Sequence, residues 1–225
     1  MNKPYLYILV LIVLCTSCTS SELVENWKNP DIETFEANKV LVIGMTADTE
    51  GRKVFERKLV SVLKKNGVSG ERSLDFFEKS FTDSPKTEED LKAIEDRLIQ
   101  AGFDAILLSK VLAVEDRVTM AQAYRNFDDN SRTFRDDYYQ SQEIYQYDEY
   151  YEEYEVYHAE TSLYCICPDK ERELIWKAAI DVTEPDNIRK AVGDYIKILV
   201  WALKEQKLLI TKIAKDEFYY EGIDL

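Results

Sequence analysis

A continuous apolar run at residues 39–45, "KVLVIGM", constrains the fold of this chain more than any other feature. A run of this length without alternation is typical of a strand buried on both faces, as in a sheet covered by helices. A helical pattern follows, which Asp48 or Thr49 can cap and Gly67 can end. Its apolar positions recur at helical spacing: Phe55, Leu59, Val62 and Leu63. The stretch therefore predicts a buried strand followed by a helix that packs on it.

The same pattern repeats further along the chain. "VSGERSLDFF" at 68–77 predicts a weaker strand, and Thr87 with Asp90 forms a capping-box pattern at the start of a second helix. Gly102 can end that helix, and the apolar run "FDAILLSKVLAVED" at 103–116 predicts a third strand. The order β-α-β-α-β implies right-handed crossovers and neighbouring parallel strands.

The second half of the chain predicts a hairpin and a helix. The strand-like runs at 154–168 and 173–182 are joined by "PDKERE", and Pro185 with Asp186 opens the strongest helix. Its apolar stripe consists of Ile188, Val192, Tyr195, Ile196, Leu199 and Leu203. The elements together predict an α/β fold with a mixed sheet and helices mainly on one face.

The chain has 225 residues and a formal net charge of -14. This length fits a single domain with ample core. The acidic balance disfavours nucleic acid as a partner and disfavours broad attachment to an anionic lipid surface. We assign the domain to 39–206, with an insertion rich in tyrosine and acidic residues at about 117–151, and a tail at 207–225.

The amino-terminal segment has the features of a secretory signal peptide. Lys3 precedes the apolar run 5–14, and small residues at 16–17 precede Cys18. The run is about half the ~20 residues that a transmembrane helix needs. A redox or metal pair of Cys15 and Cys18 is the competing interpretation, but such pairs lie in turns beside strand-helix units. The pattern therefore indicates that residues 1–17 are a signal peptide.

The stretch "LCTSC" resembles the lipobox of bacterial lipoproteins. This resemblance implies that Cys18 becomes the first residue of the mature protein and carries the lipid attachment. The polar segment 18–38 is then expected to be a tether. Its Trp27 and Phe35 can dock onto the α/β domain. Each buried CH₂ of an acyl chain contributes about 0.8 kcal/mol, so several chains hold a protein stably on a membrane.

The domain pattern resembles the α/β domains of cell-envelope lipoproteins related to the amino-terminal domain of TolB, to CsgG and to LpoB. The resembling stretches begin at "KVLVIGM", "GFDAILLSKV" and "RELIWKAAIDV". The chain also resembles uncharacterised Bacteroidetes-type envelope lipoproteins. The resemblance implies an outer membrane lipoprotein of a Gram-negative bacterium, facing the periplasm or the outside. It implies a non-enzymatic binding or assembly module that binds another envelope protein or itself, and it transfers no active site.

Cys165 and Cys167 stand two residues apart on a predicted strand. An extended strand would separate their Cα atoms by about 6.5–7 Å, which is at the limit for a disulfide. The spacing therefore favours buried free thiols, with a labile disulfide as the alternative.

The insertion contains tyrosines at helical spacing: Tyr147, Tyr150, Tyr151 and Tyr154. They form a possible interaction surface for a ligand or carbohydrate, because tyrosine offers a rigid contact area with a polar tip. The favoured interpretation is a solvated insertion whose acidic residues keep its aromatic residues soluble.

The sequence contains none of the common catalytic motifs. His158 is the single histidine and is followed by Ala159 and Glu160, which excludes an H-E-x-x-H zinc site. There is no glycine-rich phosphate loop and no nucleophile elbow, and we expect no cofactor. A hydrolase that uses acidic residues remains the enzymatic alternative, because the separation of carboxylates in space cannot be read from a sequence.

Overall fold

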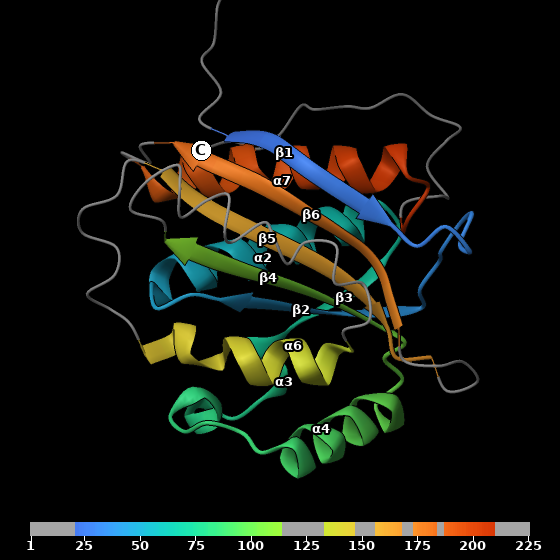
Figure 1. The fold of residues 1–225 in the computed structure, drawn as a ribbon, viewed down its shortest axis with the longest axis vertical. Helices are drawn as coiled ribbons and strands as arrows, with labels where there is room; N and C mark the ends of the chain where they lie inside the picture. Colours follow the sequence, from blue (N-terminus) through green and yellow to red (C-terminus); the bar gives the residue numbers. More distant parts are fainter. Residues whose placement is uncertain (1–20, 114–132, 147–155, 168–172, 184–186, 210–225) are drawn as a thin grey trace, which may run out of the picture.

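The computed structural model describes residues 21–113, 133–146, 156–167, 173–183 and 187–209. Its centre is a six-stranded sheet with the strand order β1-β6-β5-β4-β2-β3 (Figure 1). The strands are β1 (Ser21–Lys28), β2 (Lys39–Met45), β3 (Ser69–Arg72), β4 (Ala105–Ala113), β5 (Val156–Cys165) and β6 (Glu173–Thr183). The helices are α2 (Thr49–Lys65), α3 (Ser73–Phe76), α4 (Glu88–Gln100), α6 (Phe134–Ser141) and α7 (Ile188–Glu205), with the 3-10 helices η1 (Lys79–Thr82) and η3 (Gln142–Gln146).

The sheet is mixed, as predicted. Strand β2 pairs in parallel with β3 and β4, whereas β4 with β5 and β5 with β6 are antiparallel pairs. Two successive antiparallel steps make β6 parallel to β4, so the carboxyl ends of β2, β4 and β6 meet at one edge of the sheet. We call it the carboxyl edge. Helices α2 and α7 both begin there, because each follows one of these strands in the chain.

The capping residues identified in the sequence define the ends of α2 and α4. The Asp48 side chain accepts hydrogen bonds at the start of α2, and Thr87 with Asp90 forms the capping box of α4. Gly67 and Gly102 follow these helices with φ angles of 75° and 81°. This left-handed backbone favours glycine because a Cβ atom would be strained there.

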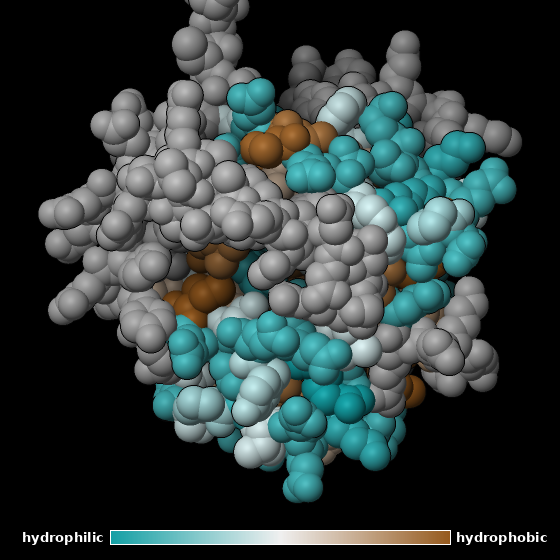
Figure 2. Space-filling view, viewed as in Figure 1, coloured by the Kyte–Doolittle hydropathy of each residue, from teal (hydrophilic) through white to brown (hydrophobic). Residues whose placement is uncertain are grey.

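The helices lie on both faces of the sheet. Helices α2 and α7 pack over one core cluster, and α4 and α6 help to enclose a second cluster on the opposite face. Alternation along β2 divides the strand between them, since Val42 belongs to the first cluster and Ile43 to the second. The α/β class is confirmed. The two longest helices, α2 and α7, cover one face of the sheet. Helices α4 and α6 lie on the other face, where the sequence predicted few helices. Hydrophilic side chains cover much of the surface over α4 in Figure 2.

The predicted tether at 18–38 is wrong for Ser21–Lys28, which forms the edge strand β1. This strand pairs antiparallel with β6, with Ser21 opposite Val182 and Lys28 opposite Trp176. A register shift between Leu23 and Glu25 interrupts the alternation, so polar and apolar residues do not show a strand period in the sequence. Trp27 and Phe35 pack against the two core clusters, so their docking is confirmed.

The predicted solvated insertion is wrong for residues 133–146. Helix α6 begins with a capping box of Thr133 and Asp136, and its Phe134 and Tyr138 are each only 2% exposed. These rings pack in the second core cluster, so α6 is a structural part of the domain. The strand predicted at 68–77 is also shorter than expected, because Ser73–Phe76 forms helix α3.

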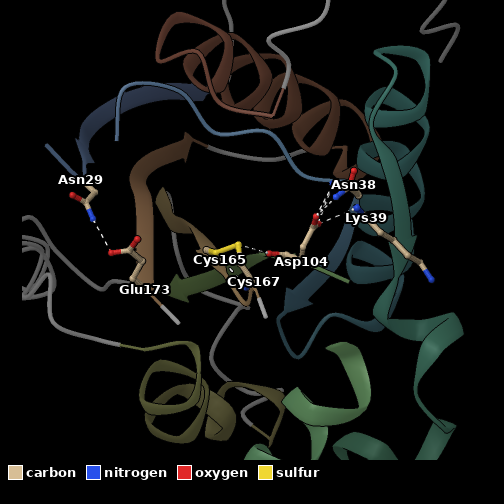
Figure 3. Close-up of a disulfide and its surroundings, with 7 residues drawn as sticks. All are labelled: Asn29, Asn38, Lys39, Asp104, Cys165, Cys167 and Glu173. Carbon is tan, nitrogen blue, oxygen red and sulfur yellow. Dashed lines mark hydrogen bonds between the residues drawn. A yellow bond between two sulfur atoms is a disulfide. The ribbon is translucent and has the colours of Figure 1, made fainter. Parts of the chain in front are cut away.

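Cys165 and Cys167 form a disulfide, which corrects the prediction of free thiols (Figure 3). Strand β5 ends at Cys165, and the chain turns so that the two Cα atoms lie 5.3 Å apart. That separation lies within the range that disulfides span, whereas a continued strand would exceed it. The neighbouring Asp104 carboxylate accepts hydrogen bonds from the amides of Asn38 and Lys39, which joins the starts of β2 and β4.

Candidate functional site

The site residues predicted from the sequence lie outside the described residues. They are the lipid attachment residue Cys18 and the tyrosines Tyr147, Tyr150, Tyr151 and Tyr154. Within the described ranges, none of the helices combines the length and the apolar character needed to cross a bilayer. The folded domain contains two candidate sites, an apolar cavity and a set of buried charges.

His158 is a buried residue of the sheet. It lies on β5 opposite Asp181 of β6, and its Nδ1 atom contacts the Asp181 carboxylate. The side chain of His158 is 2% exposed. The structure thus places the single histidine in a pair with a carboxylate of the adjacent strand, inside the domain.

A cavity of about 290 Å³ opens at the carboxyl edge, between the sheet and the first turns of α2 and α7. We call it the carboxyl-edge pocket. Its apolar lining includes Phe55, Val111, Val182, Ile188, Ala191 and Val192. Ile188 is 40% exposed, so an apolar side chain stands open to solvent at the start of α7. Ligands of open α/β sheets commonly bind at the carboxyl ends of the strands.

The charged residues of the pocket are already bound to other groups of the protein. The Asp48 carboxylate accepts hydrogen bonds of 3.0 Å from the amides of Glu50 and Gly51. The Arg52 guanidinium donates to Glu56 at 3.1 Å and to Ser73 at 3.0 Å. Both charges therefore serve the start of α2 and its junction with the neighbouring elements.

A short chain of hydroxyl groups reaches the wall of the pocket, because Ser109 and Tyr195 line the cavity. The Ser109 and Thr161 hydroxyls are 2.5 Å apart, and the Thr161 hydroxyl is 2.5 Å from the phenol oxygen of Tyr195. Burial raises the pKa of Tyr195 to about 12. The phenol therefore stays protonated at neutral pH and satisfies its hydrogen-bonding needs within the protein.

These features suit the pocket to the binding of an apolar group. Burial of apolar surface contributes roughly 25 cal/mol per Å², and the pocket offers mainly apolar side chains to a ligand. Ligand sites usually combine such a lining with a few polar groups that orient the ligand. Tyr157 and Thr46, which also line the cavity, are polar residues that can do so.

A network of buried charges lies on the opposite face of the sheet, under α6. The Lys110 ammonium contacts Asp137 at 2.6 Å and Glu160 at 2.7 Å, and Lys177 contacts Glu160 at 3.3 Å. The Tyr164 hydroxyl donates to Asp137 at 2.6 Å. Four charged side chains thus neutralise one another between β4, β5, β6 and α6.

The pKa shifts of Asp137 and Lys110 keep these two groups charged. Burial alone would raise the pKa of Asp137, but Lys110 and the hydrogen bonds outweigh burial and hold the pKa below its usual value. Burial opposes the charge of Lys110 as well, yet Asp137 and Glu160 raise its pKa. Paired ions that remain charged at neutral pH suit a structural role. Among the described residues, no group of three or more His, Cys, Asp or Glu side chains is placed to hold a metal ion.

The sequence did not identify either the pocket or the network. One signal was available for the network, because Lys110 interrupts the apolar strand "AILLSKVLA" and a lysine in such a position requires a buried partner. Its partner Asp137 lies in the segment that the sequence placed in the insertion. The pocket has no comparable signal, since it is built from side chains of separate strands and helices.

Comparison with known proteins gave matches to solved structures only. No family model matches the chain, and no curated protein matches it. The chain is similar to the PelC dodecamer of Paraburkholderia phytofirmans with a TM-score of 0.42 and 10% identity, covering 84% of this chain and 98% of that chain. It is similar to lipoprotein GNA1162 of Neisseria meningitidis with a TM-score of 0.37 and 14% identity, and the match covers 80% of this chain and 99% of that chain. Identity and TM-score are low in both cases, and no residue role is carried over from either protein.

Proposed function

We propose that this protein is a lipid-anchored protein of a Gram-negative cell envelope whose α/β domain is a non-enzymatic binding module. The anchor is Cys18, and the binding site is the carboxyl-edge pocket. The observation that carries the proposal of a binding site is the apolar cavity between the first turns of α2 and α7. The proposal of an anchor rests on the lipobox-like "LCTSC" at 14–18.

The chemistry of the pocket supports binding over hydrolysis. A hydrolase that uses acidic residues needs two carboxyl groups that reach the same substrate. Among the described residues that line the pocket, Asp48 is the only one with a carboxyl group, and it caps α2. The buried carboxylates Asp137 and Glu160 lie on the opposite face and pair with lysines. The domain thus offers a cavity for an apolar group.

The anchor is tested by replacing Cys18 with alanine. Because cleavage in a lipobox takes place before the cysteine, the first 17 residues are exchanged for a signal peptide whose cleavage needs no cysteine. We expect the wild-type protein in the membrane fraction and nearly all of the Cys18→Ala protein in the soluble fraction, since the buried CH₂ groups are lost. Carbonate washing and immunoblotting measure the distribution. A variant that stays on the membrane would contradict the proposed anchor.

The pocket is tested with the apolar fluorescent probe N-phenyl-1-naphthylamine. We expect the unlipidated mature chain to bind it, and Val192→Phe to weaken binding roughly tenfold or more by filling the cavity. Val62→Phe is the matched control, because Val62 packs against the same core cluster but does not line the pocket. Fluorescence titration measures both affinities. Equal loss in the two variants would show that the probe does not occupy the pocket.

A further inference from the structure

The amino-terminal end of β1 lies beside the carboxyl-edge pocket. Ser21 pairs with Val182, and Val182 is one of the residues that line the cavity. Cys18 precedes Ser21 by three residues, and three residues span at most about 11 Å. Because β1 is part of the sheet, a lipid on Cys18 must leave the domain near the carboxyl edge. An anchored domain therefore holds this edge close to the bilayer.

The outer surface of α2 and α7 beside the pocket is rich in basic residues. We call this set the basic cluster: Lys53, Arg57, Lys58, Arg189, Lys190 and Lys197. The two helices meet here, since the Lys58 ammonium donates to the Arg189 carbonyl at 2.8 Å. The pKa of Lys58 is lowered by burial and further by Arg189, Arg57 and Lys197, so these charges lie close to one another.

The positive charge of the basic cluster is only partly neutralised. Glu50 binds Lys53 at 2.6 Å, and Asp194 binds Lys190 at 2.9 Å and Lys197 at 3.2 Å. Counted over the residues that the structure describes, these two carboxylates leave a local surplus of positive charge on a chain whose net charge is -14. Such a surplus on a strongly acidic protein can attract an anionic group to one place on the surface.

The apolar and cationic features meet at the start of α7. Ile188 lines the pocket and is followed directly by Arg189 of the basic cluster. A ligand with an apolar chain and an anionic head can therefore contact both at once. Phospholipids have this chemistry, and they form the surface to which the anchor holds the carboxyl edge.

We infer that the carboxyl edge faces the membrane and that the pocket takes an acyl chain of a phospholipid, whose phosphate binds the basic cluster. The inference rests on the proposed anchor at Cys18, which sets the orientation. Arginine and lysine bind phosphate through charge-assisted hydrogen bonds, while the cavity removes part of the chain from water. The headgroup stays outside the cavity.

The first test measures lipid binding by calorimetry. Mature protein carrying Cys18→Ala is titrated with dioctanoyl phosphatidylglycerol below its micelle concentration. We expect binding of one lipid per chain, displacement of N-phenyl-1-naphthylamine, and roughly tenfold weaker binding in the double variant Arg57→Glu/Arg189→Glu. Neutral dioctanoylglycerol should bind both proteins equally. Lys92→Glu is the control, because Lys92 is an exposed lysine of α4, which packs on the opposite face.

Three outcomes overturn the inference. Equal affinity of the phospholipid for the double variant and for its parent would show that the basic cluster does not bind the phosphate. If N-phenyl-1-naphthylamine binds in the pocket and the lipid does not, the inference fails while the proposed binding module stands. In lipidated protein on membranes, p-benzoylphenylalanine in place of the half-exposed Ile188 at the opening of the pocket should cross-link to phospholipid, as read by mass spectrometry. A cross-link to the amino-terminal peptide would instead identify the acyl chains of Cys18 as the occupant.

Discussion

Asp137→Ala is expected to lower the free energy of unfolding by about 3–5 kcal/mol, because it removes one partner of a buried ion pair. The side chains of Lys110 and Asp137 are 6% and 3% exposed. Without Asp137, Lys110 keeps only Glu160 among the carboxylates it contacts, and the Tyr164 hydroxyl loses its acceptor. Urea denaturation followed by circular dichroism measures the loss.

The pH dependence of this loss tests its cause. The lowered pKa of Asp137 stabilises the fold above about pH 4, and this stabilisation is lost as the pH falls through the folded-state pKa. The raised pKa of Lys110 stabilises the fold below about pH 10, and this part is lost at higher pH. The difference between wild type and variant should be largest near neutral pH and should narrow in strong acid. A difference that does not change with pH would show that lost packing is the cause.

Tyr139→Ala is the matched control for this prediction. Tyr139 lies on the same helix but is 47% exposed, so we expect a change within about 0.5 kcal/mol. A double-mutant cycle with Lys110→Ala separates the pair from its surroundings, and the coupling between Lys110 and Asp137 should exceed about 1 kcal/mol. No coupling would mean that the 2.6 Å contact contributes nothing to stability.

Trp176→Ala is expected to destabilise the domain by a similar amount, about 3–5 kcal/mol, by opening a cavity in the core. Trp176 is fully buried on β6 within the cluster under α2 and α7. Its indole Nε1 has no hydrogen-bond partner among the described residues. Trp176→Phe should therefore cost only roughly 1–2 kcal/mol, because the ring keeps most contacts and no hydrogen bond is lost.

Trp201→Ala provides the comparison for a tryptophan outside the core. Trp201 lies on α7 and is 49% exposed, so the expected loss is about 1 kcal/mol or less. Thermal denaturation measures the three variants. The fall in Tm should be largest for Trp176→Ala, smaller for Trp176→Phe and smallest for Trp201→Ala. If the phenylalanine variant is as unstable as Trp176→Ala, the indole nitrogen must have a partner in solution.

The elements that the sequence predicted well are those with local signals. The run "KVLVIGM", the Asp48 cap and Gly67 together define β2 and α2. The capping box of Thr87 and the apolar stripe of α7 gave the other long helices. Such signals act within one turn or one strand, so they can be read without knowing the rest of the fold.

The elements that the sequence missed depend on distant partners. Strand β1 is stable only as a neighbour of β6, and its polar residues suit an edge that faces solvent on one side. Helix α6 is polar except for the rings that it buries, and its Asp137 is accounted for only by Lys110 of β4. Cys165 and Cys167 pair because the strand ends between them, which no spacing rule for strands includes.

The pocket was beyond prediction for a related reason. Its walls come from the four strands β2, β4, β5 and β6, from helices α2 and α7, and from the segment after β2, so no single stretch of sequence contains it. Tyr195 was expected in the apolar stripe of α7, and it does lie in the core, but its hydroxyl contact with Thr161 depends on the position of the helix over β5. Only the assembled sheet shows which side chains enclose a cavity.

The pairing of β1 with β6 has a mechanical consequence. Seven residue pairs hold β1 to its neighbour along the length of the strand. A pull on the amino terminus in the direction of the strand loads these hydrogen bonds in parallel, in shear, and does not peel them apart one after another. The rate of unfolding, and not the equilibrium free energy, determines how well a domain resists such a pull. With the proposed anchor at Cys18, the domain would withstand a pull on its amino terminus better than one that is joined to its anchor through a helix end.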